Sequence, residues 1–93
     1  MTHSPTTGVV VTGGGSGIGR ATCLALAEVG RPVSAWDVNA AGAEETAALC
    51  HARYGGAVHA IGVDLRTGDS IAAARDAARA VLGPIGGLVH AAG

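Results

Sequence analysis

The stretch that decides the fold of this chain reads Thr12-Gly13-Gly14-Gly15-Ser16-Gly17-Ile18-Gly19. Before it, the β-branched run over 8–12 predicts a strand buried on both faces of a parallel sheet. After it, residues 17–29 have a helical pattern, and Gly30 stands where a helix-ending glycine is common. Glycines between a strand and a helix permit positive φ and let the backbone approach a phosphate at the helix N-terminus. The stretch therefore predicts a phosphate-binding turn.

Strands and helices are expected to alternate along the rest of the chain. The patterns predict a strand over 33–37, a helix over 40–54, a strand over 58–63, a helix over 67–82 and a strand over 88–91. Each crossover is long enough to join parallel strands through a helix, and right-handed crossovers then give the sheet order 3-2-1-4. We therefore predict an α/β fold, a partial doubly wound parallel sheet over 8–93 behind a flexible N-terminus over 1–7.

The first expected helix carries an apolar stripe that should face the sheet. Its members are Ile18, Ala21, Ala25, Leu26 and Val29. The two cysteines, Cys23 and Cys50, fall within expected helices and are interpreted as reduced, packed thiols. Neither they nor the four histidines have the spacing of metal ligands, so no metal site is predicted.

The composition limits the classes of partner that the chain is expected to bind. The 93 residues are 48% hydrophobic and 14% charged, with a formal net charge of -1. A chain without a basic field is a poor partner for nucleic acid. No apolar run reaches the roughly 20 residues that span a bilayer, and no N-terminal leader pattern is present, so we expect a cytoplasmic protein that binds no membrane.

Asp37 ends the second expected strand and supplies the second part of the phosphate-site pattern. A carboxylate in this place, downstream of a glycine turn, can accept hydrogen bonds from both hydroxyls of an adenosine ribose. Its negative charge would repel a 2′-phosphate, and neither Ser16 nor Val38 brings a cation to neutralise one. The residues therefore favour NAD over NADP as the cofactor.

Two other kinds of nucleotide site also contain a glycine-rich turn. Gly14 and Gly19 have the spacing of a nucleoside-triphosphate loop, but Arg20 and Ala21 stand where that loop needs Lys and then Ser or Thr. An S-adenosylmethionine methyltransferase also uses a glycine-rich first turn with acids after the next strands, and the spacing of the glycines disfavours it here. It stays as a remote alternative.

At this point the sequence resembles the short-chain dehydrogenase/reductase family. Thr12, Gly13, Gly17 and Gly19 match the family pattern Thr-Gly-x-x-x-Gly-x-Gly in full. The resemblance implies a Rossmann-type dinucleotide-binding domain, of which residues 8–93 are the N-terminal part. It also implies that Asp64-Leu65 contacts the adenine ring, and that His90-Ala91-Ala92-Gly93 stands where the family has Asn-Asn-Ala-Gly.

The cofactor-binding residues expected from the pattern and the resemblance form one set. They are Gly13, Ser16, Gly17, Ile18, Gly19, Asp37, Asp64, Leu65, His90 and Ala91. No catalytic residue is predicted within the chain, because the family acts through a Ser, a Tyr and a Lys that come later in its sequence. This chain contains no lysine, and Tyr54, its one tyrosine, is expected to have a packing or surface role.

Three hypotheses for function follow. In the first, the chain is the NAD-binding portion of an oxidoreductase that transfers hydride between the cofactor and a small alcohol or ketone. In the second, it is a non-catalytic nucleotide-binding or interaction module, docking through an exposed sheet face and edge, and a homo-oligomer is then possible. In the third, it is a truncated piece without an independent role.

Overall fold

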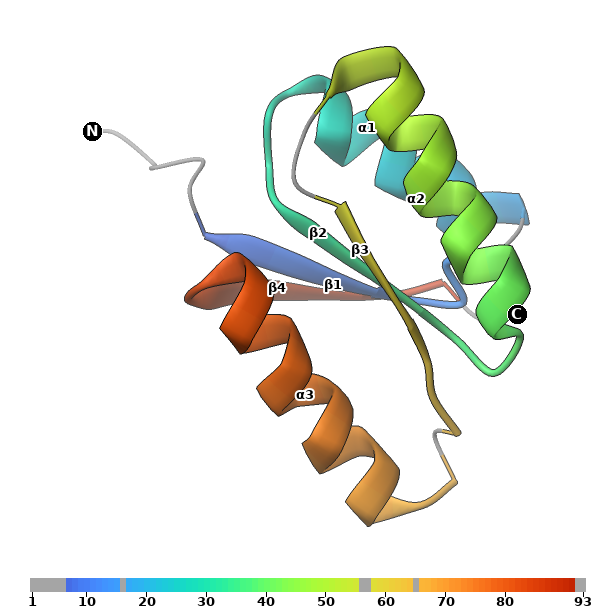
Figure 1. Ribbon diagram of the computed structural model, residues 1–93, viewed down its shortest axis with the longest axis vertical. Helices are drawn as coiled ribbons and strands as arrows, with labels where there is room; N and C mark the ends of the chain where they lie inside the picture. Colours follow the sequence, from blue (N-terminus) through green and yellow to red (C-terminus); the bar gives the residue numbers. More distant parts are fainter. Residues whose placement is uncertain (1–6, 16, 56–57, 65, 92–93) are drawn as a thin grey trace.

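The computed structural model describes residues 7–15, 17–55, 58–64 and 66–91 (Figure 1). Seven elements alternate along the chain: β1 (Gly8–Thr12), α1 (Gly17–Glu28), β2 (Val33–Asp37), α2 (Ala40–Tyr54), β3 (Val58–Gly62), α3 (Gly68–Leu82) and β4 (Ile85–His90). Residues 1–6 of the predicted flexible N-terminus, and the sites predicted at Ser16 and Leu65, lie outside the described residues.

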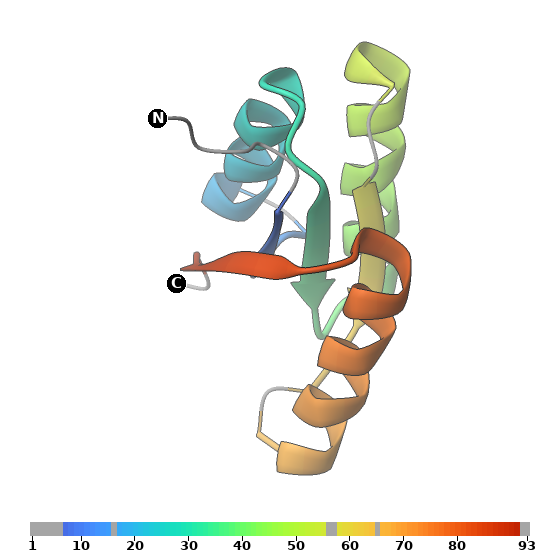
Figure 2. The ribbon, with the colours of Figure 1, turned by 90° about the vertical axis from the view of Figure 1, so that its left-hand side faces the viewer.

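The four strands form one parallel sheet in the order β3-β2-β1-β4, as predicted. β4 is an edge strand and faces the viewer in Figure 2. It begins at Ile85, earlier than the sequence pattern indicated, because Gly86 and Gly87 mask the strand signal. Gly87 nevertheless pairs with Val9 of β1, after a register shift between Gly8 and Val9. Hydrogen bonding to the buried strand β1 therefore outweighs the low strand propensity of these two glycines.

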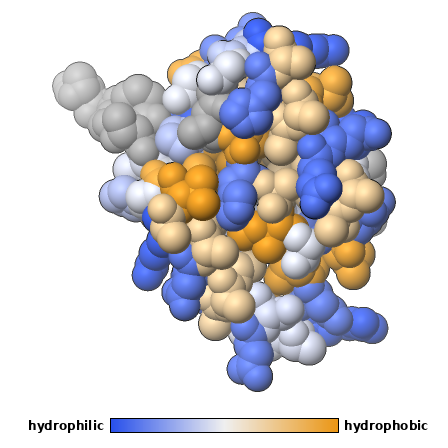
Figure 3. Space-filling model, viewed as in Figure 1, coloured by the Kyte–Doolittle hydropathy of each residue, from blue (hydrophilic) through white to orange (hydrophobic). Residues whose placement is uncertain are grey.

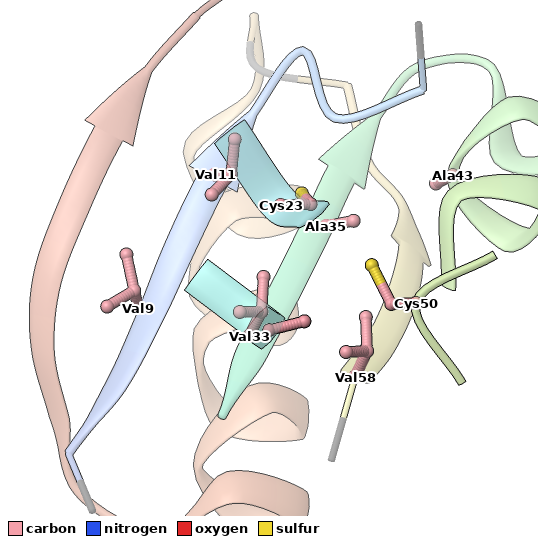
Figure 4. Close-up of a cluster of buried hydrophobic side chains, with 9 residues drawn as sticks. Val9, Val11, Cys23, Val33, Ala35, Ala43, Cys50 and Val58 are labelled. Carbon is pink, nitrogen blue, oxygen red and sulfur yellow. The ribbon is translucent and has the colours of Figure 1, made fainter. Parts of the chain in front are cut away.

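Alternate residues of the strands build two separate cores. On one face, Val9, Val11 and Val33 pack with side chains from α1 and α2 (Figure 4). On the other face, Val10 and Trp36 pack against α3. Figure 1 shows the result, with α1 and α2 together on one side of the sheet and α3 alone on the other. Right-handed crossovers in both directions from β1 give this arrangement.

The buried stripe of α1 differs from the predicted one. Its buried residues are Gly19, Cys23 and Ala27, whereas Ile18 is 76% exposed and Val29 is 66% exposed. Small side chains on the inner stripe let the helix backbone lie close to the sheet, which larger ones would prevent. Of the predicted stripe, only Leu26 is partly buried and packs against this core, so the prediction for the stripe as a whole was wrong.

The described helices include none that is long and apolar enough to cross a membrane.

Candidate dinucleotide site

The glycine turn leaves the carboxyl end of β1 and enters α1 at Gly17. Gly13 and Gly17 have φ values of 73° and 58°, in the left-handed region that side-chain-bearing residues rarely adopt. A Cβ on Gly17 would meet no atom of the chain within 4 Å, so this backbone borders open space. A Cβ on Gly19, in contrast, would overlap the carbonyl oxygen of Gly13. The turn is therefore closed against the helix and open on its outer side.

The backbone N–H groups of the turn divide into two sets. Gly14 N donates to Trp36 O at 2.9 Å, and Gly15 N donates to Asp37 Oδ2 at 2.8 Å. These two donors are already used inside the protein. In the first turn of a helix the N–H groups have no intrahelical acceptor, so those of Ile18 and Gly19 need an acceptor from outside the helix, such as an anion. The positive end of the α1 dipole adds to this preference.

The carboxylate of Asp37, at the end of β2, is held by two backbone N–H groups. Its Oδ2 accepts the Gly15 N–H at 2.8 Å, and its Oδ1 accepts the Asn39 N–H at 2.9 Å. Each carboxylate oxygen keeps further lone pairs for an outside donor. A Cβ on Gly15 would come within 2.6 Å of Asp37 Oδ2, so the glycine is what lets the acid approach the turn. The structure thus brings the predicted acid against the predicted turn.

Val38 follows this acid and was not among the predicted contacts. It is 76% exposed, which is unusual for a valine beside a strand end. In the sequence, Val38 attracts notice only because it brings no cation beside Asp37. Its position directly after an acid at the carboxyl edge of the sheet is the signal that could have marked it as a candidate contact.

Asp64 lies after β3 at the same edge, and Arg66 contacts it at both oxygens. Arg66 Nε donates to Oδ1 and Nη2 donates to Oδ2, each at 3.0 Å, and Arg66 N donates to Oδ1 at 2.9 Å. These hydrogen bonds lower the pKa of Asp64, the side-chain bonds from Arg66 contributing most. Asp64 is therefore a fixed carboxylate with a positive partner.

His90 ends β4 next to Thr12, the first residue of the turn motif. Thr12 Oγ1 and His90 Nδ1 lie 2.8 Å apart, and Ala91 N donates to Thr12 O at 3.0 Å. His90 thus connects the end of β4 to the turn. The contact links His90 and Ala91 to the site through Thr12.

These residues meet at one edge because all four strands are parallel, so their carboxyl ends lie on the same side. Tyr54, at the far end of α2, is 40% exposed, which agrees with a surface role. Within the described parts of the chain, no group of three His, Cys, Asp or Glu side chains is placed to hold a metal ion.

Comparisons with known proteins identify the family to which this chain belongs. A sequence profile described as short chain dehydrogenase matches residues 7–93. The chain belongs to the short-chain dehydrogenase family. Within it, the chain corresponds to the N-terminal, dinucleotide-binding portion, and the predicted resemblance and parallel fold are confirmed.

Relatives within the short-chain dehydrogenase family are similar over nearly all of the chain. A probable galactose dehydrogenase of Rhizobium meliloti is 46% identical over 86 residues, which are 89% of this chain and 32% of that protein. Estradiol 17-beta-dehydrogenase 11 of Homo sapiens is 38% identical over 85 residues, 91% of this chain and 28% of the relative. A family member from Burkholderia phymatum, solved in complex with NAD, superposes with a TM-score of 0.83 at 30% identity, covering 88% of this chain and 29% of that one. This chain thus spans about a third of the length of these relatives.

Proposed function

We propose that the chain binds NAD(H) at the carboxyl edge of its sheet. The observation that carries the proposal is the Asp37 carboxylate, fixed against Gly15 N at 2.8 Å and still able to accept ribose hydroxyls. The N–H groups of Ile18 and Gly19, in the first turn of α1, would bind the pyrophosphate. Val38 and Asp64 would border the adenine, and His90 with Ala91 would close the site beside Thr12.

The same acid supports NAD over NADP. A 2′-phosphate would lie against the negative charge of Asp37 and would need a cation to offset it. Arg20 contacts the turn, but its Nη2 is 2.7 Å from Glu45 Oε1 and 2.6 Å from Gly15 O. Its charge is therefore already compensated. A dinucleotide without the extra phosphate is the better match.

The longer protein of which this portion is typical would be an oxidoreductase that moves hydride between NAD(H) and an alcohol or ketone. The nicotinamide would supply the hydride chemistry, and this chain would hold and orient the cofactor. The Ser, Tyr and Lys expected for proton transfer have no counterpart in its sequence, which lacks lysine. We therefore expect binding without turnover from these residues alone. A cytoplasmic location stays a prediction, to be tested by imaging a tagged chain in cells.

A second candidate function is association through β4. Within the described sheet the outer edge of β4 has no neighbouring strand, and its Leu88 is 68% exposed. Unpaired strand edges are templates for pairing with another chain. A homo-oligomer joined at this edge would show a mass that rises with concentration in sedimentation equilibrium, whereas a constant monomer mass would exclude it.

Titration of the chain with NADH and NADPH tests the proposed function. Wild type should bind NADH more tightly than NADPH. Asp37→Asn should weaken NADH binding about tenfold or more, because hydrogen bonds to a charged group contribute on the order of 1.5–3 kcal/mol. The same substitution should also reduce the preference of the chain for NADH over NADPH. Asp76→Asn, on an exposed part of α3, is the matched control and should leave both affinities unchanged. Equal binding by wild type and Asp37→Asn would rule out the assigned site.

A further inference from the structure

Arg20 connects the glycine turn to α2. It belongs to α1, but its side chain crosses to the neighbouring helix, where Nε donates to Thr46 Oγ1 at 2.9 Å. Its Nη2 donates to Gly15 O at 2.6 Å and lies 2.7 Å from Glu45 Oε1. A single guanidinium thus bonds to the turn and to two consecutive residues of α2.

Thr46 completes a second connection between the same parts. Its side chain is fully buried, and Oγ1 donates to Gly14 O at 2.6 Å while it accepts from Arg20. The hydroxyl therefore uses its one proton on the turn and one lone pair on the arginine. A threonine in mid-helix often bonds to its own helix backbone, but this one bonds to a distant glycine.

We propose that Arg20 and Thr46 are positioning residues of the dinucleotide site, which hold the glycine turn in its binding shape before any cofactor arrives. The inference rests on the proposed function, because it assigns a purpose to contacts around that site. Neither residue needs to touch the cofactor.

The hydrogen bonds of Gly14 and Gly15 show how the positioning works. Their N–H groups bond to Trp36 O and Asp37, and their carbonyls bond to Thr46 and Arg20. Two consecutive residues thus have both their backbone donor and their backbone acceptor bonded. Glycine loses more conformational freedom on ordering than any other residue, so a free glycine turn would bind ligand poorly. Ordering it in advance removes that cost from the binding step.

Charge alone does not explain the arrangement. A guanidinium near a pyrophosphate site attracts anions. The Arg20 guanidinium, however, is already bonded to Glu45 and to the backbone carbonyls Gly15 O and Gly42 O. If Arg20 acted only by charge, Arg20→Lys would bind NADH as well as wild type. If it acts by its forked geometry, the single nitrogen of a lysine cannot replace the separate bonds from Nε to Thr46 and from Nη2 to Gly15, and affinity falls.

The test compares paired variants of the chain by NADH titration and by amide NMR of the free protein. Thr46→Val, which keeps the shape but removes the hydroxyl, should weaken NADH binding about tenfold and broaden the Gly14 and Gly15 amide signals. Thr46→Ser restores the hydroxyl and should return both readouts close to wild type. Arg20→Lys should fall between wild type and Arg20→Met. Arg53→Gln, on the exposed end of α2, is the control and should change neither readout.

The outcomes separate the inference from the proposed function. A wild type that binds no NADH would remove the proposed function and this inference together. Wild-type binding with unchanged affinity in Thr46→Val and Arg20→Met would overturn the positioning role alone. Weaker binding with undisturbed Gly14 and Gly15 signals would also overturn it, because the turn would then keep its shape without these contacts. Should Thr46→Val fail to fold, the Arg20 series decides, since that side chain is partly exposed.

Discussion

At the scale of single residues, the site depends on acids whose oxygens are already engaged by the chain. Asp37 is bonded to two backbone N–H groups and Asp64 to Arg66, so neither carboxylate has to be ordered when a ligand binds. A fixed acceptor binds a hydroxyl or an amine more tightly than a mobile one, because less side-chain entropy is lost. This is where binding specificity is expected to reside.

Asp64 should titrate below the usual range of an aspartate, because Arg66 lowers its pKa. The carboxylate keeps its charge in the folded chain at a pH where an unfolded aspartate is becoming protonated. Its stabilising contribution is therefore present above the ordinary aspartate pKa and is lost as the pH falls through the lowered value. Carboxyl-carbon NMR of Asp64 checks the shift, and Arg66→Gln should bring the pKa back toward the ordinary value. An unchanged titration in Arg66→Gln would mean that the ion pair does not form in solution.

The two cysteines should be unreactive while the chain is folded. Burial raises the pKa of Cys23 to about 12 and also raises that of Cys50. The thiolate is the reactive form, so alkylation by iodoacetamide near pH 8 should be slow for the native chain and fast after urea unfolding. Because the unfolded thiols ionise first, stability should decrease as the pH rises above about 9. Rapid labelling of native Cys23 would show that the α1 core opens readily.

The positions and contacts of some residues could be predicted from the sequence better than those of others. Asp37 was predictable because its place depends on spacing along one β-α-β unit, which the sequence displays directly. Thr46 was not, since its role depends on a bond to Gly14, 32 residues earlier in the sequence, and a threonine in a helix gives no local signal. The Arg20 role was hidden for the same reason. Contacts within a motif can be read from the chain, whereas contacts between helices require the packing.

At the scale of elements, the fit of α1 on the turn depends on Gly19. Its missing Cβ lets the helix begin against the Gly13 carbonyl. The sequence predicted the helix and its start correctly, but most of the predicted stripe is exposed, because close packing on the sheet selected the small residues Gly19, Cys23 and Ala27 instead. The strand order, in contrast, was predictable because crossover handedness leaves few choices.

Gly19→Ala should destabilise the chain by about 1–3 kcal/mol or more, because the added methyl overlaps backbone that can move only with the whole turn. It should also weaken NADH binding by shifting the N–H groups of the first helical turn. Urea unfolding measures the first effect and titration the second. Gly68→Ala is the matched control, since a Cβ there meets no atom within 4 Å, and it should be neutral or slightly stabilising. Equal stability of the two variants would contradict the close approach of α1.

At the scale of the whole molecule, the two faces of the sheet are covered unequally. α1 and α2 share one face, whereas α3 alone covers the other (Figures 1 and 2). A cavity of about 220 Å³ remains there between α3 and the strands, with Val10, Trp36 and Leu88 among its lining. Figure 3 shows apolar surface, in orange, among polar groups over the middle of the molecule.

Incomplete cover of this face should make it bind an apolar dye. The residue Trp36 forms part of the cavity lining and is only 5% exposed, so a dye such as anilinonaphthalene sulfonate in the cavity should receive energy from it. Leu88→Glu, at the β4 side, should weaken dye binding several-fold, because it places on the apolar wall a negative charge that repels the sulfonate of the dye. Val29→Glu introduces the same change just after α1 and should not weaken dye binding, since that exposed valine does not line the cavity. Dye binding lost equally in both variants would mean that a general change in charge, rather than this cavity, controls it. Dye binding without energy transfer from Trp36 would place the open apolar surface elsewhere on the molecule.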